Sequence, residues 1–274
     1  MKTAAKKSNV TRLRTVGKPR LKAVRDRIDP REWQERVDLA AAYRLTALMG
    51  WTDMIGTHIS CRVPDTHDEF LLNPYGMLFE EITASSLIKI DVDGNKLSAS
   101  PYEVNQAGFT IHSAIHMGRH DANAVMHLHT GYGVAVATQK HGLLPATQQA
   151  LTALNLVRYH AYEGVAFDHS ERERLIQDLG DGGMLILRNH GTLTVGATVG
   201  EMFQRMYRLE RACRFQILAL AGGSELSPLP QEVISHALDQ GRQIYSKGGQ
   251  SAGGKLVWAA LLRKLDRENP GYAA

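Results

Sequence analysis

Hydrophobic and polar positions follow two different spacings along the chain. Apolar residues three and four apart predict helices over residues 30–50, 109–119, 171–179 and 201–221. Short apolar runs and alternating patterns predict strands at residues 58–63, 70–72, 87–91, 124–129 and 184–187. Because the two kinds of element interleave, we expect one α/β domain with a mixed sheet over roughly residues 30–222.

The two ends of the chain differ from this domain. Residues 1–27 hold ten Lys and Arg against one acid, Asp26, in a chain whose net charge is +4. The basicity therefore belongs to the N-terminus, and the rest of the chain is mildly acidic. We interpret residues 1–29 as a disordered, solvated arm and not as a nucleic-acid-binding segment. Residues 223–274 are expected to form a tail that packs on the domain or on a neighbouring subunit.

Composition places the chain among ordinary globular proteins, with 43% hydrophobic and 22% charged residues. Cys61 and Cys213 are the two cysteines, which suggests a reducing compartment and no disulfide framework. The basic N-terminus has no apolar core of a secretory signal, and no stretch approaches the ~20 apolar residues that span a bilayer. We expect a soluble, cytoplasmic protein with no membrane partner.

Three histidines form a candidate metal-binding site. His127 and His129 flank Leu128 on a predicted strand, so their side chains point to the same face. His190 follows the next apolar strand and offers a third imidazole, and Gly191 after it permits close approach of a backbone or ligand. A catalytic zinc uses three protein ligands and one open position. A hydrogen-bonded pair of core histidines remains the alternative.

The text around these histidines resembles the class II aldolase/adducin superfamily, and its adducin-like bacterial branch in particular. The resemblance spans roughly residues 30–222, in the same order and spacing, and is carried by THISCRVP (57–64), NPYGMLFEEITASSLIKID (73–91), DANAVMHLHT (121–130) and RNHGTLTVG (188–196). It implies a three-layer α/β/α sandwich with a mixed, mainly antiparallel central sheet, assembled as a homotetramer with sites at subunit interfaces. It also implies that His127, His129 and His190 bind zinc or another divalent metal such as manganese.

The position of the general base departs from the family pattern. Sugar-phosphate aldolases of this superfamily place a glutamate nineteen residues before the first metal histidine, and that position is Gly108 here. Two residues are candidates for the missing acid–base role. His112 lies one helical turn after Gly108, as a base, a fourth ligand or a packed helix histidine. Glu103 is the nearest acid upstream.

The phosphate pocket of the resembled aldolases is also altered. Thr57-His58 replaces a Gly-Asn pair, Tyr75 replaces a small hydroxyl residue, and Gln106-Ala107 replaces a Ser-Ser pair. A non-phosphorylated substrate is therefore expected. Five other residues are weaker acid–base candidates that we expect to be structural: His58, Tyr132, Tyr159, His160 and Glu163.

Two functions remain open from the sequence. The first is a metal-dependent lyase, an aldolase or a decarboxylase, acting on a small oxygenated metabolite. The second is an adducin-like binding or assembly module that keeps the metal-site scaffold without catalysis. Gly108 favours the second, and the intact histidines favour the first.

Overall fold

The structure, a computed structural model, describes residues 24–165, 170–246 and 254–274. Residues 1–23, which make up most of the predicted basic arm, lie outside the described part. So do residues 248–253 of the glycine-rich stretch near the C-terminus.

Seven strands form one mixed sheet in the order β3-β2-β1-β4-β7-β6-β5. Every neighbouring pair is antiparallel except β5 and β6, which are parallel. The strands are β1 (His58–Arg62), β2 (Glu69–Leu72), β3 (Ile88–Asp91), β4 (Ala124–Leu128), β5 (Val157–His160), β6 (Met184–Leu187) and β7 (Gly191–Gly196).

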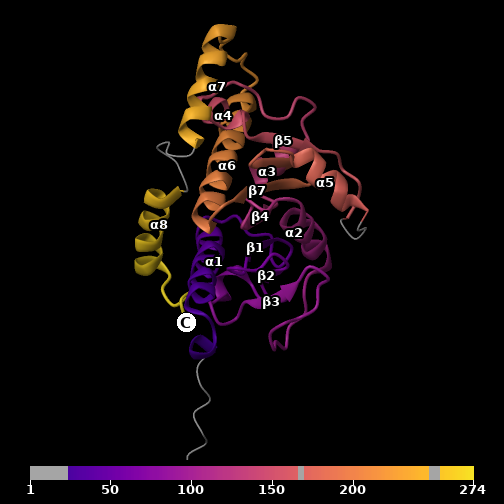
Figure 1. Cartoon of the computed structure of the whole chain (residues 1–274). Coiled ribbons are helices and arrows are strands. Elements are labelled where there is room, and N and C mark those ends of the chain that lie inside the picture. Colours follow the sequence, from indigo (N-terminus) through magenta and orange to yellow (C-terminus); the bar gives the residue numbers. More distant parts are fainter. Residues whose placement is uncertain (1–23, 166–169, 247–253) are drawn as a thin grey trace, which may run out of the picture.

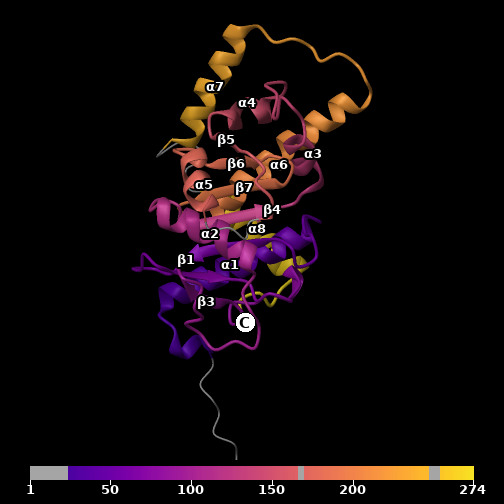
Figure 2. The same cartoon turned by 90° about the vertical axis from the view of Figure 1, so that its right-hand side faces the viewer.

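Helices cover both faces of the sheet. The first face packs on α1 (Pro30–Leu48), α6 (Val199–Ala221) and α8 (Lys255–Glu268), and the second on α2 (Gln106–Gly118) and α5 (Glu171–Leu179) (Figures 1 and 2). The remaining helices are α3 (Gly131–Ala137), α4 (Gln148–Leu154), α7 (Gln231–Tyr245) and the short η1 (Val24–Arg27) and η2 (Phe79–Glu81). The predicted three-layer α/β/α sandwich with a mainly antiparallel sheet is confirmed.

Strand alternation decides which side chains of β1 and β4 share a layer. Ile59 and Cys61 pack in the core beneath α1 and α6. The residues between them, His58 and Ser60, face α2, and the register pairs His58 with His127 of β4. Polar side chains therefore enter a buried layer, where each needs a hydrogen-bond partner.

Some elements differ from the sequence prediction. Helix α3, which the spacing did not predict, begins at Gly131, where the Thr130 side chain caps it by accepting a hydrogen bond from the backbone N–H of Gly133. Strand β7 and helix α7 were not predicted. In the C-terminal region α7 packs on α4, and α8 packs on α1 and α6.

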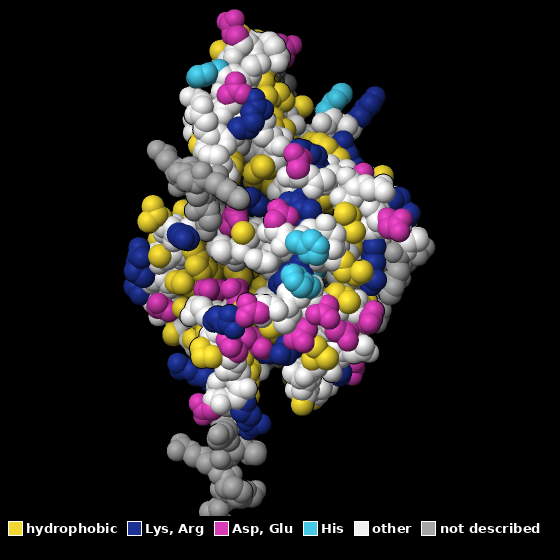
Figure 3. Space-filling view, viewed as in Figure 1, with side chains coloured by type: hydrophobic (Ala, Val, Ile, Leu, Met, Phe, Trp, Pro, Cys, Tyr) yellow, Lys and Arg dark blue, Asp and Glu magenta, His cyan; other side chains and the backbone are white. Residues whose placement is uncertain are grey.

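In the view of Figure 3 Asp and Glu side chains gather in a band across the lower middle of the molecule, with Lys and Arg side chains among them. On α8, the Leu256 side chain is 84% exposed and that of Val257 is 42% exposed. No helix within the described ranges has the length and apolar character to cross a membrane.

A carboxyl group in α1 should make stability depend on pH. Burial, with the nearby charge of Asp38, raises the pKa of Glu35 from 4.5 to about 7. Between these two values the folded protein keeps a proton that the unfolded chain releases, so the free energy of unfolding falls as pH rises through this window. We expect Glu35→Gln to flatten that fall and to stabilise the protein by at most about 3 kcal/mol above pH 7.

Urea unfolding at pH 5 and pH 8 measures this effect, with the exposed Glu232→Gln on α7 as the matched control. The prediction is wrong if Glu35→Gln and Glu232→Gln retain the same pH dependence as the unmodified protein.

Candidate metal centre

The ends of three neighbouring strands bring the three histidines together. His127 lies in β4, and His129 directly follows the end of that strand. His190 lies in the turn between β6 and β7, where Asn189 takes a positive φ of 58°. The nitrogen atoms that the three imidazoles can offer to a metal lie within 4.8 Å of one another.

Hydrogen bonds orient two of these imidazoles. Nδ1 of His127 lies 3.1 Å from the backbone oxygen of Thr192, and because a carbonyl only accepts, this nitrogen carries the proton. Nδ1 of His129 lies 2.8 Å from a carboxylate oxygen of Asp53. The Nε2 atoms of His127 and His129 are thereby left for a ligand, and they are 3.0 Å apart. Tetrahedral zinc, with Zn–N bonds of about 2.0–2.1 Å, needs nitrogens roughly 3.3 Å apart, so the pair fits such an ion.

Burial favours the neutral, ligand form of the imidazoles. It holds the pKa of His127 well below its ordinary value, with the positive charge that His190 would carry as the next cause. Burial also lowers the pKa of His190 to about 4, followed by the effect of His129. Because metals bind unprotonated imidazole, this environment suits a metal centre.

Gly191 is required by packing at this centre. A Cβ atom at this position would lie 2.5 Å from the backbone oxygen of Leu128 and 3.0 Å from Cδ2 of His129. Any side chain there would displace the strand that carries two of the histidines.

Two residues of the centre were missed from the sequence. Asp53 lies in the loop before β1, far along the chain from His129, and its side chain is 50% exposed. The ring of Tyr162 lies 6.4 Å from that of His190. Asp53 belongs to no spaced motif, and the sequence around Tyr162 does not place its ring beside His190, so both contacts are seen only in the folded chain.

His112 lies behind the three histidines and does not join them. Its Nε2 is 2.7 Å from Nδ1 of His58, and its Nδ1 is 2.5 Å from the Ser60 hydroxyl. That hydroxyl is also 2.7 Å from Nε2 of His116. A buried chain thus runs from His116 through Ser60 and His112 to His58, whose ring lies 5.1 Å from that of His127.

Gly108 provides the space for His58. A Cβ atom at residue 108 would lie 2.6 Å from Cδ2 and 2.8 Å from Cγ of the His58 ring. The position where the resembled aldolases carry a glutamate is therefore filled from the side by an imidazole. His58 itself stands where those enzymes have an asparagine, so the two replacements occur in contact.

Glu103 points elsewhere. Its side chain is 78% exposed and pairs with Lys96 at 3.1 Å, and its backbone bridges to Tyr75. Within the described ranges no contact joins Glu103 to the three histidines.

The other candidates have structural contacts. His160 is buried between Asp178 at 2.7 Å and Glu171 at 3.2 Å. Glu163 pairs with Arg174 at 2.7 Å, and the Tyr159 hydroxyl accepts a hydrogen bond from the backbone N–H of Leu143 at 2.9 Å. The Tyr132 ring contacts the guanidinium of Arg214.

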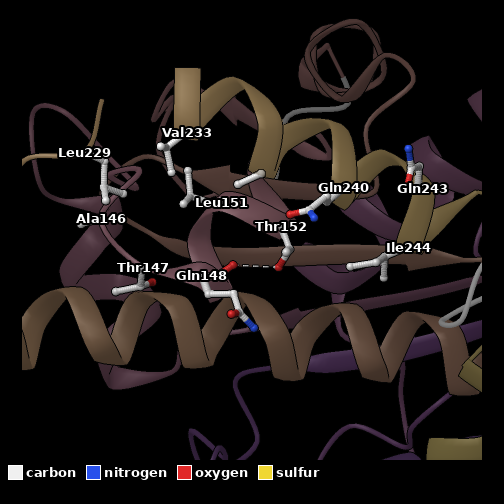
Figure 4. Close-up of a pocket in the computed structure, with 11 residues that line it drawn as sticks. Ala146, Thr147, Gln148, Leu151, Thr152, Leu229, Val233, Gln240, Gln243 and Ile244 are labelled. Atoms are coloured by element: carbon white, nitrogen blue, oxygen red, sulfur yellow. Dashed lines mark hydrogen bonds between the residues drawn. The ribbon is translucent and has the colours of Figure 1, made fainter. Parts of the chain in front are cut away.

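A large cavity lies between α4 and α7, away from the histidines (Figure 4). Its volume is about 810 Å³, and apolar and amide or hydroxyl side chains line it, among them Leu151, Val233 and Gln240. No charged side chain takes part in this lining, so the cavity offers no acid–base chemistry.

The chain belongs to the class II aldolase/adducin family. The family profile described as Class II Aldolase and Adducin N-terminal domain matches residues 37–217. This range includes the three histidines and the loop that carries Asp53.

Relatives of both kinds are similar to the chain. A Pseudomonas aeruginosa protein that carries the provisional name of aldolase class 2 protein is 54% identical over 250 residues, covering 91% of this chain and 95% of that protein. Alpha-adducin of Rattus norvegicus is 40% identical over 255 residues, covering 86% of this chain but 33% of alpha-adducin.

Solved structures share the fold. An aldolase II superfamily protein from Pseudomonas syringae superimposes with a TM-score of 0.85 at 49% identity, covering 92% of this chain and 99% of that one. An L-fuculose 1-phosphate aldolase from Glaciozyma antarctica gives a TM-score of 0.74 at 25% identity, covering 88% of this chain and 93% of that one.

Because residues 58 and 108 are in contact, substitutions at these two positions should have non-additive effects on the free energy of unfolding. We expect Gly108→Glu alone to destabilise the protein by several kcal/mol, since the new side chain meets the His58 ring. With His58→Asn present, the same substitution should cost at least about 1 kcal/mol less, because the shorter side chain leaves room for the carboxylate. Urea unfolding of both single variants and the double variant gives the coupling energy. Additive effects would show that residue 108 does not depend on His58 for its space.

Proposed function

We propose that the chain is a divalent-metal-dependent lyase of the class II aldolase type, either an aldolase or a decarboxylase. Its substrate would be a small, oxygenated, non-phosphorylated metabolite. One observation carries the proposal: the imidazoles of His127, His129 and His190 converge within 4.8 Å, while Asp53 and the Thr192 carbonyl hold two of them by Nδ1. This anchoring by outer partners is typical of imidazoles that bind metals.

The bound ion, zinc or another divalent metal such as manganese, would supply Lewis-acid chemistry to a substrate oxygen. Asp53 would keep the His129 ring in place and make it a stronger donor. Tyr162, 55% exposed beside His190, would border the substrate.

We assign proton transfer to His58, with His112 as its positioning residue. The assignment is based on the position of the His58 ring, which fills the space beside Gly108 and lies 5.1 Å from the His127 ring. His112 holds the ring by a 2.7 Å hydrogen bond to Nδ1. His58 thus takes the acid–base role for which the sequence suggested His112 and Glu103. His58 lies between His112 and His127, and Glu103 pairs with Lys96.

A non-phosphorylated substrate follows from the same region. His58 and Tyr75 stand where the resembled sugar-phosphate enzymes have smaller residues, and Tyr75 is 45% exposed. A bulky ring is a poor neighbour for a hydrated phosphate. We also propose a homotetramer, as the family resemblance implies, in which a neighbouring subunit covers the exposed side of the centre.

A second candidate is a non-catalytic, adducin-like binding or assembly module. The 40% identity to alpha-adducin and the glycine at residue 108 favour it. Both candidates share the three histidines, so metal binding tests the centre and turnover separates the two functions.

Metal analysis of the purified full-length chain tests the centre. We expect about one equivalent of divalent metal per chain and almost none in the His127→Ala, His129→Ala double variant. Asp53→Asn should weaken metal affinity by about 10- to 100-fold, because the carboxylate that holds Nδ1 of His129 is lost. His141→Ala, a histidine outside the centre, is the matched control. A wild-type chain that takes up neither zinc nor manganese would contradict the proposed centre.

Turnover distinguishes the lyase from the binding module. We expect the metal-loaded protein to cleave or decarboxylate members of a panel of small hydroxy-ketones and hydroxy-acids, detected by product analysis. His58→Gln should lower kcat by about 100-fold or more while keeping its metal, because the amide does not exchange protons. Unchanged kcat in His58→Gln would overturn its role. A fully loaded protein inactive on the whole panel would favour the adducin-like module.

A further inference from the structure

A second cavity lies beside the metal centre, with a volume of about 400 Å³. Trp51, Tyr132, Tyr207 and Arg211 are among the residues that line it. Trp51 is two residues from Asp53, and Gly131, also in the lining, is two residues from His129. Because a chain advances at most about 3.6 Å per residue, this rim lies within about 7 Å of the backbone that holds the centre.

Two arginines give this cavity its charge. Arg211 and Arg214 both come from α6, and neither makes an ion pair with a carboxylate anywhere in the described part of the chain. The only acid in the lining is Glu210, whose carboxylate is turned to the Thr130 hydroxyl at 2.5 Å and the Gly133 N–H at 3.1 Å. The cavity therefore carries two positive charges and one negative charge that is already hydrogen-bonded.

Aromatic rings hold these arginines and wall the cavity. The Arg211 guanidinium lies 4.6 Å from the centre of the Phe215 ring, and that of Arg214 lies 5.6 Å from the Tyr132 ring. The rings of Trp51 and Tyr207 lie 6.0 Å apart. A guanidinium fixed against a ring keeps its N–H donors for a ligand and loses little entropy when it binds one.

We propose that this cavity binds the carboxylate of a small organic acid. Arg211 and Arg214 supply the N–H donors, and Trp51 and Tyr207 pack on the carbon skeleton. The volume suits a small molecule, and the combination of aromatic walls with a few polar groups is typical of ligand pockets. The rings of Trp51 and Tyr207 favour an acid with a carbon skeleton over inorganic phosphate, which offers no apolar surface to pack on. The proposal stands on the cavity itself and does not depend on the lyase function or on bound metal.

Trp51 provides the measurement, since it is one of three tryptophans and lines the cavity. Full-length protein, after chelator treatment and separately after zinc loading, is titrated with malonate, with its neutral diamide and with inorganic phosphate. We expect saturable fluorescence change with malonate in both preparations, weaker binding of phosphate and none of the diamide. Calorimetry of the unmodified protein should give the same malonate affinity as the fluorescence titration.

Charge-neutral variants locate the site. Arg211→Gln and Arg214→Gln should each weaken malonate binding by about 10-fold or more, since each removes a charged hydrogen-bond donor. Arg263→Gln on the exposed side of α8 is the matched control and should bind as the unmodified protein does.

Three outcomes would overturn the proposal. The first is equal malonate binding in the Arg211 and Arg214 variants and in the control. The second is binding that disappears with chelation, which would place the carboxylate on the metal. The third is an altered oligomer size of the arginine variants in gel filtration with unchanged malonate affinity, which would make the cavity a contact between copies. Loss of metal in the histidine double variant affects the lyase function alone and leaves this site intact.

Discussion

The burial of uncharged imidazoles between the sheet and α2 is the constraint on which the centre depends. His58, His112, His116 and His127 are all at most 2% exposed, and burial is the leading cause that lowers the pKa of each. A buried imidazole without partners would be costly, so these side chains bond to one another, to Ser60 and to the Thr192 carbonyl. The antiparallel pairing of β1 with β4 makes this possible by placing His58 opposite His127.

The paired replacement at residues 58 and 108 follows from that layer. With a side chain at residue 108 the His58 ring has no space, and without His58 the glycine would leave a cavity next to the centre. The family fold is thus kept, as the TM-score of 0.74 to an L-fuculose 1-phosphate aldolase indicates, while the groups next to the three histidines change. Similar backbones therefore leave the substrate class open, because the substrate contacts those groups and not the fold.

Much of the fold and part of the centre could be predicted from the sequence, because both depend on local periodicity. The histidines of β4 are two residues apart on a strand, so local periodicity predicts a shared face, and strand–helix alternation predicts the sandwich. Asp53 and His58 could not be assigned, because their contacts depend on strand register and loop path over long separations. Strand β7 was missed because its Thr and Gly residues obscure the apolar pattern, although Thr192 and Thr194 are buried against α6. Helix α7 was missed although its apolar residues Val233, Ala237 and Ile244 recur at helical spacing, because polar residues surround this apolar side and most of the helix is exposed.

The buried chain gives the proposed acid–base residue two uncharged states. Each neutral imidazole carries one N–H, and the Ser60 hydroxyl can donate to one neighbour while it accepts from the other. If His116 donates to Ser60, Ser60 to His112 and His112 to Nδ1 of His58, the proton of His58 sits on Nε2, which then acts as an acid. If every bond reverses, Nδ1 of His58 donates to His112 and Nε2 has a lone pair, which acts as a base. Both arrangements hold the same number of protons, so a proton that Nε2 takes up adds one positive charge to the chain. Relay along the reversed bonds would carry that charge from His58 through His112 and Ser60 to His116, away from the ring of His127.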